Sequence, residues 1–416
     1  MNERSSSLQP VNKSQQLGIN DRLNNFAKSA LFKLLSKPET GYLSVKEDGS
    51  IIAEFGDPSD KLQADINITN NRFYSRVLLG GSCAAGESFI DGWWSTSNLT
   101  TLVQFFARNL STLDSWENSF SWLLQPLSKL RKRSRRNSHK QAKQNILAHY
   151  DLGNDLYTLF LDDQMQYSSA LFNAATDSLA QAQSNKMHRL CQQLELSAQD
   201  HLLEIGSGWG GLAIFAARHY GCTVTTTTIS DAQFSYARKA ITKAGLENKI
   251  ELLNSDYREL EGSYDKIVSV EMIEAVGEKY LPVFFEYANN LLKPGGKIIL
   301  QAITIADQRS QSYASGEDFI QKHIFPGGFL PSINIMSQLI SKHTELIIRD
   351  LHDIGFDYAR TLALWRERLL ENSHLLSQKG FDDRFIKLWL FYLGYSEGGF
   401  LERRISAVQL LATKDG

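Results

Sequence analysis

Short apolar runs alternate with amphipathic stretches over the larger part of the chain, from about residue 145 onward. The runs read HLLEIG, CTVTTTTI, KIELLN, YDKIVSVE and GKIILQAITI, and they occupy residues 201–206, 222–229, 249–254, 264–271 and 296–305. Strand-length apolar runs separated by helix-length segments are typical of an α/β fold with a doubly wound, mainly parallel sheet. In such a sheet we expect the ligand beyond the carboxyl ends of the strands.

This alternation stops after Ile305. Residues 306–346 contain the segment FIQKHIFPGGFLPS, which is rich in aromatic and turn-forming residues and predicts an insertion. A last strand is expected at Ile405–Thr413. We therefore assign residues 145–416 to one large domain that carries an insertion at 306–346.

The N-terminal part of the chain has a different pattern. A strand-like piece at Gly49–Gly56 and a helical piece at Leu99–Leu110 predict a smaller α+β domain over residues 26–128. Residues 1–25 are polar and predict a disordered N-terminus.

A basic run, KLRKRSRRNSHK, separates the two domains, so residues 129–144 are expected to be a basic linker. A solvated linker and a patch for anionic phospholipid headgroups are both open interpretations of this run. Nucleic acid is not the expected partner, because no aromatic residues interleave the charges and the net charge of the whole chain is −2.

The composition fits a two-domain globular protein: 416 residues, 42% hydrophobic and 22% charged. We see no leader sequence and no apolar run near 18 residues, and we expect a cytoplasmic protein. The cysteines are Cys83, Cys191 and Cys222; their odd number and scattered positions argue against a disulfide framework and against a cysteine-based metal site.

The segment Leu202–Gly211, LLEIGSGWGG, carries the strongest chemical signal. Glycines at the carboxyl end of a strand allow a tight turn that brings backbone N–H groups close to a ligand. Their spacing differs from a dinucleotide fingerprint, and with the preceding acid it better suits the amino-acid end of S-adenosylmethionine. A plain structural turn is the alternative. The candidate cofactor-binding residues in this segment are Glu204, Gly206, Gly208 and Gly210.

The ends of the next two strands supply further candidates. Thr228 and Gln233 can hydrogen-bond a ribose diol, although a strand end followed by a helix N-cap explains the same residues. Asp256 and Tyr257 can hold the amino group and the face of an adenine, or they can be an exposed loop pair.

Two further segments contain clusters of polar residues. His149–Phe172 is dense in Tyr, Asp and Asn, and this composition argues against a purely structural role for the segment. VEMIEAVG places two acids at the carboxyl end of the fourth strand, and we expect Glu274 near the crevice and Glu271 facing a neighbouring element.

Taken together, the ordered motifs HYDLGNDLY, MQYSSALF, GSGWGG, TISDAQ, VEMIEAVG, LKPGG, IFPGGFLPS and DYARTLALWRERL resemble those of the cyclopropane-fatty-acid synthases and their mycolic-acid relatives. The resemblance begins near Arg72, with NRFYSRVLLGGSCAAGESFIDGWW in the N-terminal domain, and continues to the end of the chain. It implies a seven-stranded class I methyltransferase sheet beside a lipid-associated N-terminal domain.

That resemblance also implies an activity: transfer of a methyl group from S-adenosylmethionine to a cis double bond in a phospholipid acyl chain, followed by proton loss and ring closure. An alkene is a poor nucleophile, so the methyl group must be held in line with the π-bond. The carbocation that follows needs a dry pocket, and aromatic faces can stabilise it.

Site residues follow from the matching motifs. The resemblance places the cofactor on Tyr167, Ser168, Gly206, Thr228, Gln233 and Tyr257. It places a bicarbonate, which accepts the proton, on Glu274, Tyr358, Ser169, Gln301 and the backbone of Ile303. Ser169 and Gln301 stand where the family usually has Cys and His, and Gln301 cannot carry a charge, so an anion would be held less strongly.

Partners are likewise implied by the resemblance: unsaturated phospholipids at the inner face of the cytoplasmic membrane, and a second copy of the chain in a homodimer. Three other functions remain open. They are a related lipid C-methylation that leaves a methyl- or methylene-bearing chain, methylation of a soluble small molecule, and lipid binding without turnover.

Overall fold

The computed structural model describes residues 13–109, 153–316 and 318–415. The chain divides into two compact units, Met1–Phe120 and Ser121–Gly416. The basic linker predicted at 129–144 and the beginning of the segment His149–Phe172 lie outside the described residues.

The N-terminal unit contains a four-stranded sheet with the order β2-β1-β3-β4. Its strands are β1 (Tyr42–Glu47), β2 (Ser50–Gly56), β3 (Gln63–Ile68) and β4 (Trp94–Ser95). Strand β1 pairs parallel with β3, and the other two pairings are antiparallel. Alternate side chains such as Leu43, Val45 and Ile66 are buried, as expected for a sheet with one covered face. The predicted α+β class of this unit is confirmed.

Three helices accompany this sheet: α1 (Lys13–Leu35), α2 (Arg72–Ile90) and α3 (Leu99–Arg108). Helix α1 contradicts the prediction that the first 25 residues are disordered, because residues 13–25 belong to it. The contacts of this helix lie mainly after residue 25: Ala27 is fully buried, and the ring of Phe32 packs edge-on against Tyr74 of α2. Residues 13–25 extend the same helix toward the N-terminus.

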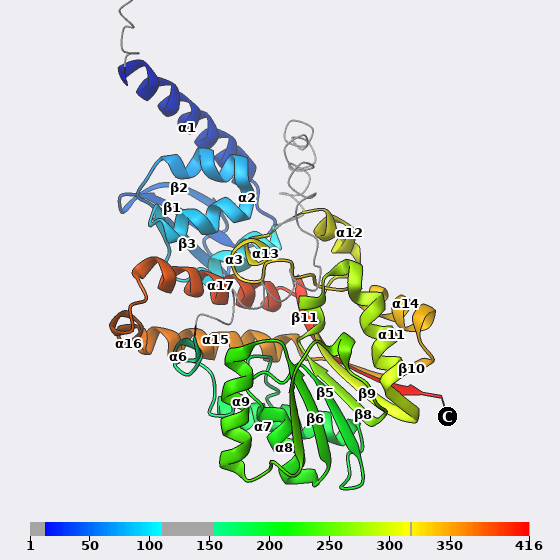
Figure 1. Cartoon of the computed structure of the whole chain (residues 1–416). Coiled ribbons are helices and arrows are strands. Elements are labelled where there is room, and N and C mark those ends of the chain that lie inside the picture. The colour runs from blue at the N-terminus through cyan, green and yellow to red at the C-terminus, as the bar shows by residue number, and fades with distance from the viewer. Residues whose placement is uncertain (1–12, 110–152, 317, 416) are drawn as a thin grey trace, which may run out of the picture. The chain divides into compact units, whose positions relative to one another are not determined.

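The larger unit is built on a seven-stranded sheet with the order β10-β11-β9-β8-β5-β6-β7 (Figure 1). Its strands are β5 (His201–Ile205), β6 (Thr223–Thr228), β7 (Ile250–Asn254), β8 (Tyr264–Val270), β9 (Leu292–Ile305), β10 (Leu346–Asp353) and β11 (Ile405–Lys414). Strand β11 runs antiparallel to both of its neighbours, and the other pairings are parallel. This is the predicted doubly wound, mainly parallel sheet.

Helices cover both faces of this sheet. On one face, α7 (Leu179–Gln193), α8 (Gly211–Tyr220) and α9 (Asp231–Ala244) pack against Leu202 and Val224. On the other, α11 (Leu281–Leu291) and α14 (Ile333–His343) pack against Leu203 and Ile205. Because successive residues of a strand point to opposite faces, a run that is apolar throughout fits a strand buried on both sides.

Two groups of helices interrupt the regular alternation. The predicted insertion holds α12 (Asp307–Ser315) and α13 (Phe319–His323) before α14. A second group, α15 (Gly355–Glu371), α16 (Ser373–Gln378) and α17 (Asp383–Leu401), lies between β10 and β11, and the sequence pattern did not predict it. Helices α15 and α17 run side by side (Figure 1).

The described part of the larger unit also contains the short helical turns α6 (Asn154–Tyr157), η2 (Tyr257–Glu259), α10 (Ile273–Val276) and η3 (Glu278–Tyr280). Among the described residues, no helix has the length and apolar character needed to cross a membrane.

Candidate active site

The glycine-rich turn after β5 forms one wall of a pocket at the carboxyl end of the sheet. Three of its glycines have positive φ: 100° at Gly206, 51° at Gly208 and 87° at Gly210. The N–H groups of Gly206 and Ser207 donate to the carbonyl of Thr227 on the neighbouring strand, at 3.1 and 2.8 Å. These bonds fix the turn against β6.

The glycines of this turn do different things. A Cβ added at Gly208 would meet nothing within 4 Å, so the backbone there faces open space in the pocket. A Cβ at Gly210 would lie 3.1 Å from the Cβ of Ala237 on α9. Gly210, predicted to bind the cofactor, therefore serves the close approach of two helices and does not line the pocket.

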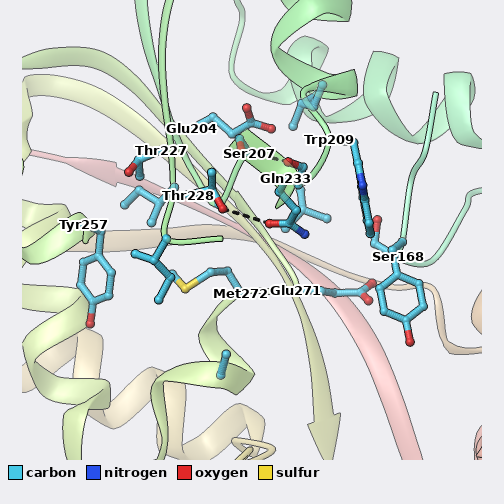
Figure 2. Close-up of a pocket in the computed structure, with 18 of the residues that line it drawn as sticks. Ser168, Glu204, Ser207, Trp209, Thr227, Thr228, Gln233, Tyr257, Glu271 and Met272 are labelled. Atoms are coloured by element: carbon cyan, nitrogen blue, oxygen red, sulfur yellow. Dashed lines mark hydrogen bonds between the residues drawn. The ribbon is translucent and has the colours of Figure 1, made fainter. Parts of the chain in front are cut away.

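Polar and apolar side chains together line this pocket. Those that Figure 2 labels are Ser168, Glu204, Ser207, Trp209, Thr227, Thr228, Gln233, Tyr257, Glu271 and Met272. Tyr257 and Trp209 lie on opposite sides, with Thr228 and Gln233 between them (Figure 2). A polar centre between two rings can hold a ligand that has both apolar and hydrogen-bonding parts.

The predicted ribose and adenine residues all line the pocket. Thr228 Oγ1 donates to Gln233 Oε1 at 3.0 Å (Figure 2), which leaves the amide nitrogen of Gln233 as a donor for a ligand. The Asp256 carboxylate accepts two bonds from the Arg258 guanidinium, at 2.8 and 2.5 Å. The Tyr257 hydroxyl is buried and has no hydrogen-bond partner among the described residues.

On the other side, the segment before α7 brings in the predicted Tyr167 and Ser168. Tyr167 is hydrogen-bonded to the Tyr392 hydroxyl of α17 at 3.1 Å, and its ring centroid lies 5.3 Å from that of Trp365. Ser168 Oγ accepts a 2.8 Å bond from the ammonium group of Lys186, which is completely buried. Burial lowers the pKa of Lys186 to about 8.

Glu204 on β5 is the first of three glutamates to be described at the pocket. It accepts a 2.5 Å bond from the Thr226 hydroxyl. Burial raises the pKa of Glu204 to about 8, so this carboxyl is largely protonated at neutral pH.

Glu271, directly after β8, accepts three hydrogen bonds. Its Oε1 accepts from the backbone N–H of Ser169 at 2.8 Å and from the amide of Gln301 at 2.9 Å. Its Oε2 accepts from the Tyr358 hydroxyl at 2.7 Å. Burial raises the pKa of Glu271, and these three donors act in the opposite direction.

The backbone of Glu271 has φ at +49°, a region that non-glycine residues seldom adopt. Strained backbone of this kind persists where surrounding contacts determine it. Here those contacts are the three donors to the side chain and a 2.7 Å bond from the Glu271 N–H to the Gln301 carbonyl.

Glu274, one turn further on, has different contacts. Its Oε1 accepts from the backbone N–H of Ile303, while its Oε2 is buried without a hydrogen-bond partner among the described residues. Burial, followed by the nearby negative charge of Glu271, raises the pKa of Glu274 to about 8. The two carboxyls therefore differ: Glu274 holds its proton at neutral pH, and Glu271 is the better placed to be charged.

These contacts correct one expectation from the sequence. Glu271 was expected to face a neighbouring element, but it lines the pocket and receives the hydroxyl of Tyr358. The reason is the positive φ after β8, which turns its side chain toward the crevice. The resemblance assigns four hydrogen-bond donors to one bound anion, but here they bind two different carboxyl groups. Ser169, Gln301 and Tyr358 donate to Glu271, and the backbone of Ile303 donates to Glu274.

Sequence reasoning also missed Lys186, which lies in a helix with no motif around it. For Glu271 the sequence did offer a signal, since an acid at the end of a strand is a candidate site residue by its position.

The segment around Tyr157, which is dense in polar residues, forms part of an aromatic cluster. The ring centroid of Tyr157 lies 4.9 Å from that of Trp209, 5.2 Å from that of Tyr167 and 5.9 Å from that of Trp389.

Comparison with known proteins identifies the group to which this site belongs. The family model described as mycolic acid cyclopropane synthetase matches residues 137–410. A tuberculostearic acid methyltransferase, UfaA1 of Mycobacterium tuberculosis, is 38% identical over 82% of this chain and 81% of its own. The cyclopropane-fatty-acyl-phospholipid synthase of Escherichia coli is 35% identical over 84% of this chain and 88% of its own.

Solved structures agree with the sequence comparison. The cyclopropane synthase MmaA2 of Mycobacterium tuberculosis superposes with a TM-score of 0.61 at 28% identity, covering 65% of this chain and 98% of that one. The mycolic acid cyclopropane synthase CmaA1, solved with SAH and CTAB, gives 0.61 at 26% identity over the same shares. The chain has the class I methyltransferase fold, is an enzyme, and belongs to the mycolic acid cyclopropane synthetase family.

Proposed function

We propose that this protein transfers a methyl group from S-adenosylmethionine to a cis double bond in the acyl chain of an unsaturated phospholipid and forms a cyclopropane. The observation that carries the proposal is the pocket at the carboxyl end of the sheet, where a glycine turn, a Thr–Gln pair and a set of buried acids meet. Extensive similarity to the phospholipid synthase of Escherichia coli supports the substrate class.

The residues of the pocket fit S-adenosylmethionine. The open space above Gly208 leaves room for a ligand close to the backbone. Gln233 offers an amide to a ribose, and the buried Tyr257 ring offers a face to an adenine. The cofactor supplies an electrophilic methyl group bonded to a sulfonium.

The surrounding side chains suit a cationic reaction path. Tyr167 lines the pocket and packs against Trp365, which is completely buried, so one side of the site is aromatic and dry. Ring faces attract a cation and excluded water cannot quench it. The Glu271 carboxylate, which accepts three hydrogen bonds, acts in the same sense.

Bicarbonate, which the resemblance implies as the proton acceptor, does not fit the site as it is arranged. Three of its expected donors already bind the Glu271 carboxylate, and the Ile303 N–H binds Glu274. We therefore assign no step to bicarbonate.

A second lipid product is a methyl-bearing chain that keeps a double bond, which forms when the proton leaves a neighbouring chain carbon. A methylene-bearing chain forms when a hydride first moves from the methylated carbon to the cationic carbon and the new methyl group then loses the proton. Similarity to the tuberculostearic acid methyltransferase UfaA1 favours this candidate. Methylation of a soluble small molecule gains no support from the first relatives, whose names refer to fatty acids.

Membrane association and dimer formation are also proposals. The basic run at 129–140 would bind anionic headgroups at the inner face of the cytoplasmic membrane, and this attraction would weaken with salt. Stronger sedimentation with anionic than with neutral vesicles at low salt would support this role. Equal, salt-independent binding would make the run a simple linker.

The deciding experiment for the function is mass spectrometry of vesicle lipids after incubation with isotopically labelled S-adenosylmethionine. Gain of one CH₂ unit with loss of the double bond is the expected result. Gain with the double bond retained would replace cyclopropanation by C-methylation. No label in lipid, despite cofactor binding, would refute the proposal and direct attention to a soluble substrate or to lipid binding alone.

A further inference from the structure

We propose that the Glu271 carboxylate is the base that removes the proton in this enzyme, in the place where the resemblance implies a bicarbonate ion. The inference rests on the proposed function, because it concerns the proton lost after methyl transfer to an alkene.

Its first support is the set of donors. A backbone N–H, an amide N–H and a phenol O–H, from three separate elements, converge on one side chain at 2.7 to 2.9 Å. They come from Ser169, Gln301 and Tyr358, the residues that the resemblance assigns to the anion. A carboxylate is planar, has two acceptor oxygens and carries one negative charge, as bicarbonate does, so the same donors suit it.

A second support is the arrangement behind these donors. The Oε1 atom of Gln301 accepts a 2.9 Å bond from Gln409 on β11, which fixes the amide so that its NH₂ group faces Glu271. The Ser169 N–H and the Gln301 amide meet at the same carboxylate oxygen. Gln301, which stands where the family usually has a titratable His, is therefore a neutral donor matched to a fixed charge on the protein.

Backbone strain supplies a third, independent observation. Glu271 has φ at +49°, where a glycine would be relaxed and glutamate costs about 1 kcal/mol or more. The fold tolerates this cost at a position whose side chain lines the pocket. Function explains why a carboxylate rather than a glycine occupies such a position.

The charges around Glu271 suit a base. The buried ammonium group of Lys186 favours the charged form of Glu271. Tyr358 donates to it and is itself held neutral, since burial raises the pKa of Tyr358 well above its ordinary value. A carboxylate with a raised pKa accepts protons better near neutral pH than an exposed one does.

In the proposed reaction, the sulfonium C–S bond breaks as the methyl carbon bonds to one alkene carbon, and the other alkene carbon becomes cationic. A C–H bond of the new methyl group then breaks, its electron pair closes the three-membered ring, and the proton moves to Glu271. The proton returns to solvent when the products leave.

Two variants of the full-length protein test this role. Glu271→Gln keeps the shape but cannot accept the proton, so we expect turnover to fall by about 10²–10⁴-fold while the affinity for S-adenosylhomocysteine stays within about twofold. Glu271→Gly relieves the positive-φ strain, so it should fold, and it leaves the three donors around an empty space. We expect this variant to be inactive in bicarbonate-depleted buffer and to recover turnover with added bicarbonate or formate.

A binding measurement separates this inference from the proposed function. In ¹³C NMR with labelled bicarbonate, we expect line broadening with Glu271→Gly and none with the unaltered protein, whether or not a lipid product is found. Broadening with the unaltered protein, stimulation of its turnover by bicarbonate, or an active Glu271→Gln variant would each overturn the assignment. A Glu271→Gly variant that binds no bicarbonate would also overturn it.

Discussion

The two sides of the pocket are built from different materials. On the cofactor side, the wall consists of glycine backbone, the neutral pair Thr228 and Gln233, and the largely protonated Glu204. On the opposite side, Glu271, Glu274 and Lys186 bring buried ionisable groups together. Shape and hydrogen bonds dominate the first side, and charge and protonation dominate the second.

This difference indicates that cofactor affinity and turnover depend on different residues of the same pocket. Backbone and neutral side chains bind a ligand with little dependence on pH, and Glu204 on this side stays largely protonated below the pKa of about 8 to which burial raises it. Buried carboxyls are costly unless they are hydrogen-bonded, so their retention indicates a task beyond holding the ligand. Changes on the first side should therefore alter affinity, and changes on the second should alter rate, pH dependence or stability.

The largest effect on affinity is expected from filling the space above Gly208. Asn tolerates the left-handed region better than most residues, so Gly208→Asn should fold at φ +51° while its side chain enters the pocket. We expect the dissociation constant of S-adenosylhomocysteine to rise about 100-fold, or about 2.7 kcal/mol, measured by titration calorimetry.

Gly245→Asn is the matched control. Gly245 has φ at +66° with open space around its Cβ position, but it ends α9 and does not line the pocket. The affinity of the Gly245→Asn variant for S-adenosylhomocysteine should equal that of the unaltered protein. If both variants bind equally well, the glycine turn is not the cofactor wall and the comparison of the two sides fails.

On the charged side, Tyr358→Phe should shift the pH dependence of turnover. The phenol donates to Glu271 Oε2, and such a bond to a charged group contributes about 1.5–3 kcal/mol. Its loss raises the pKa of Glu271 further, in the same direction as burial and against the opposing effect of Lys186. Because the base acts as a carboxylate, the acidic limb of the kcat profile should move to higher pH by roughly one unit.

The fall in kcat should then approach about tenfold on the acidic limb and become smaller as the pH rises above it, with an unchanged dissociation constant for S-adenosylhomocysteine. A uniform loss at every pH would indicate that Tyr358 only supports the fold. Its ring stacks on Phe400 at 4.5 Å, and Phe at this position preserves that contact.

Much of this architecture could be predicted from the sequence. The alternation of apolar runs predicted the type of the sheet and the positions of most of its strands along the chain, since strands buried on both faces are visible as continuous apolar segments. Glycine at a strand end gave the turn, and residues near strand ends gave Thr228, Gln233 and Tyr257. The helices α15 and α17 were missed because the expected rhythm has one crossover per strand.

The charged cluster was predicted only in part, for a physical reason. Whether Glu271 or Glu274 faces the pocket depends on one backbone dihedral after β8, and no local pattern indicates a positive φ at a glutamate. The partners of Glu271 are 102, 30 and 87 residues away in sequence. Their meeting is a property of the sheet and of α15 together.

Glu274 allows a test of protonation through stability. The pKa of Glu274 is raised to about 8 by burial, from an ordinary value of 4.5. The folded form keeps a proton that the unfolded chain loses, so this group's contribution is fully present below pH 4.5 and is lost as the pH rises to about 8. Glu274→Gln removes that dependence and keeps the acceptor for the Ile303 N–H.

We expect this variant to match the unaltered protein near pH 4.5 and to exceed its unfolding free energy by at least about 1 kcal/mol at pH 8, where one pKa unit corresponds to about 1.4 kcal/mol. Urea unfolding at the two pH values is the measurement. A difference that does not change with pH would mean that Glu274 is charged throughout, and the contrast between the two acids would disappear.

The smallest effect is expected from Thr228→Val, on the neutral side. The change removes the hydroxyl that holds Gln233 Oε1 at 3.0 Å, so the amide loses its fixed orientation but stays in the pocket. A neutral hydrogen bond contributes about 1 kcal/mol, which predicts an approximately fivefold weaker affinity for S-adenosylhomocysteine and no change in the pH profile.

Thr225→Val on the same strand is the control, because Thr225 is equally buried but donates to Glu251 and does not line the pocket. Both variants lose one hydroxyl of β6, so their stabilities should fall by similar amounts while only Thr228→Val loses affinity. A pH-dependent loss in Thr228→Val would connect the neutral wall to the titrating groups. In that case the two sides of the pocket would act as one electrostatic unit, and affinity and turnover could not be altered separately.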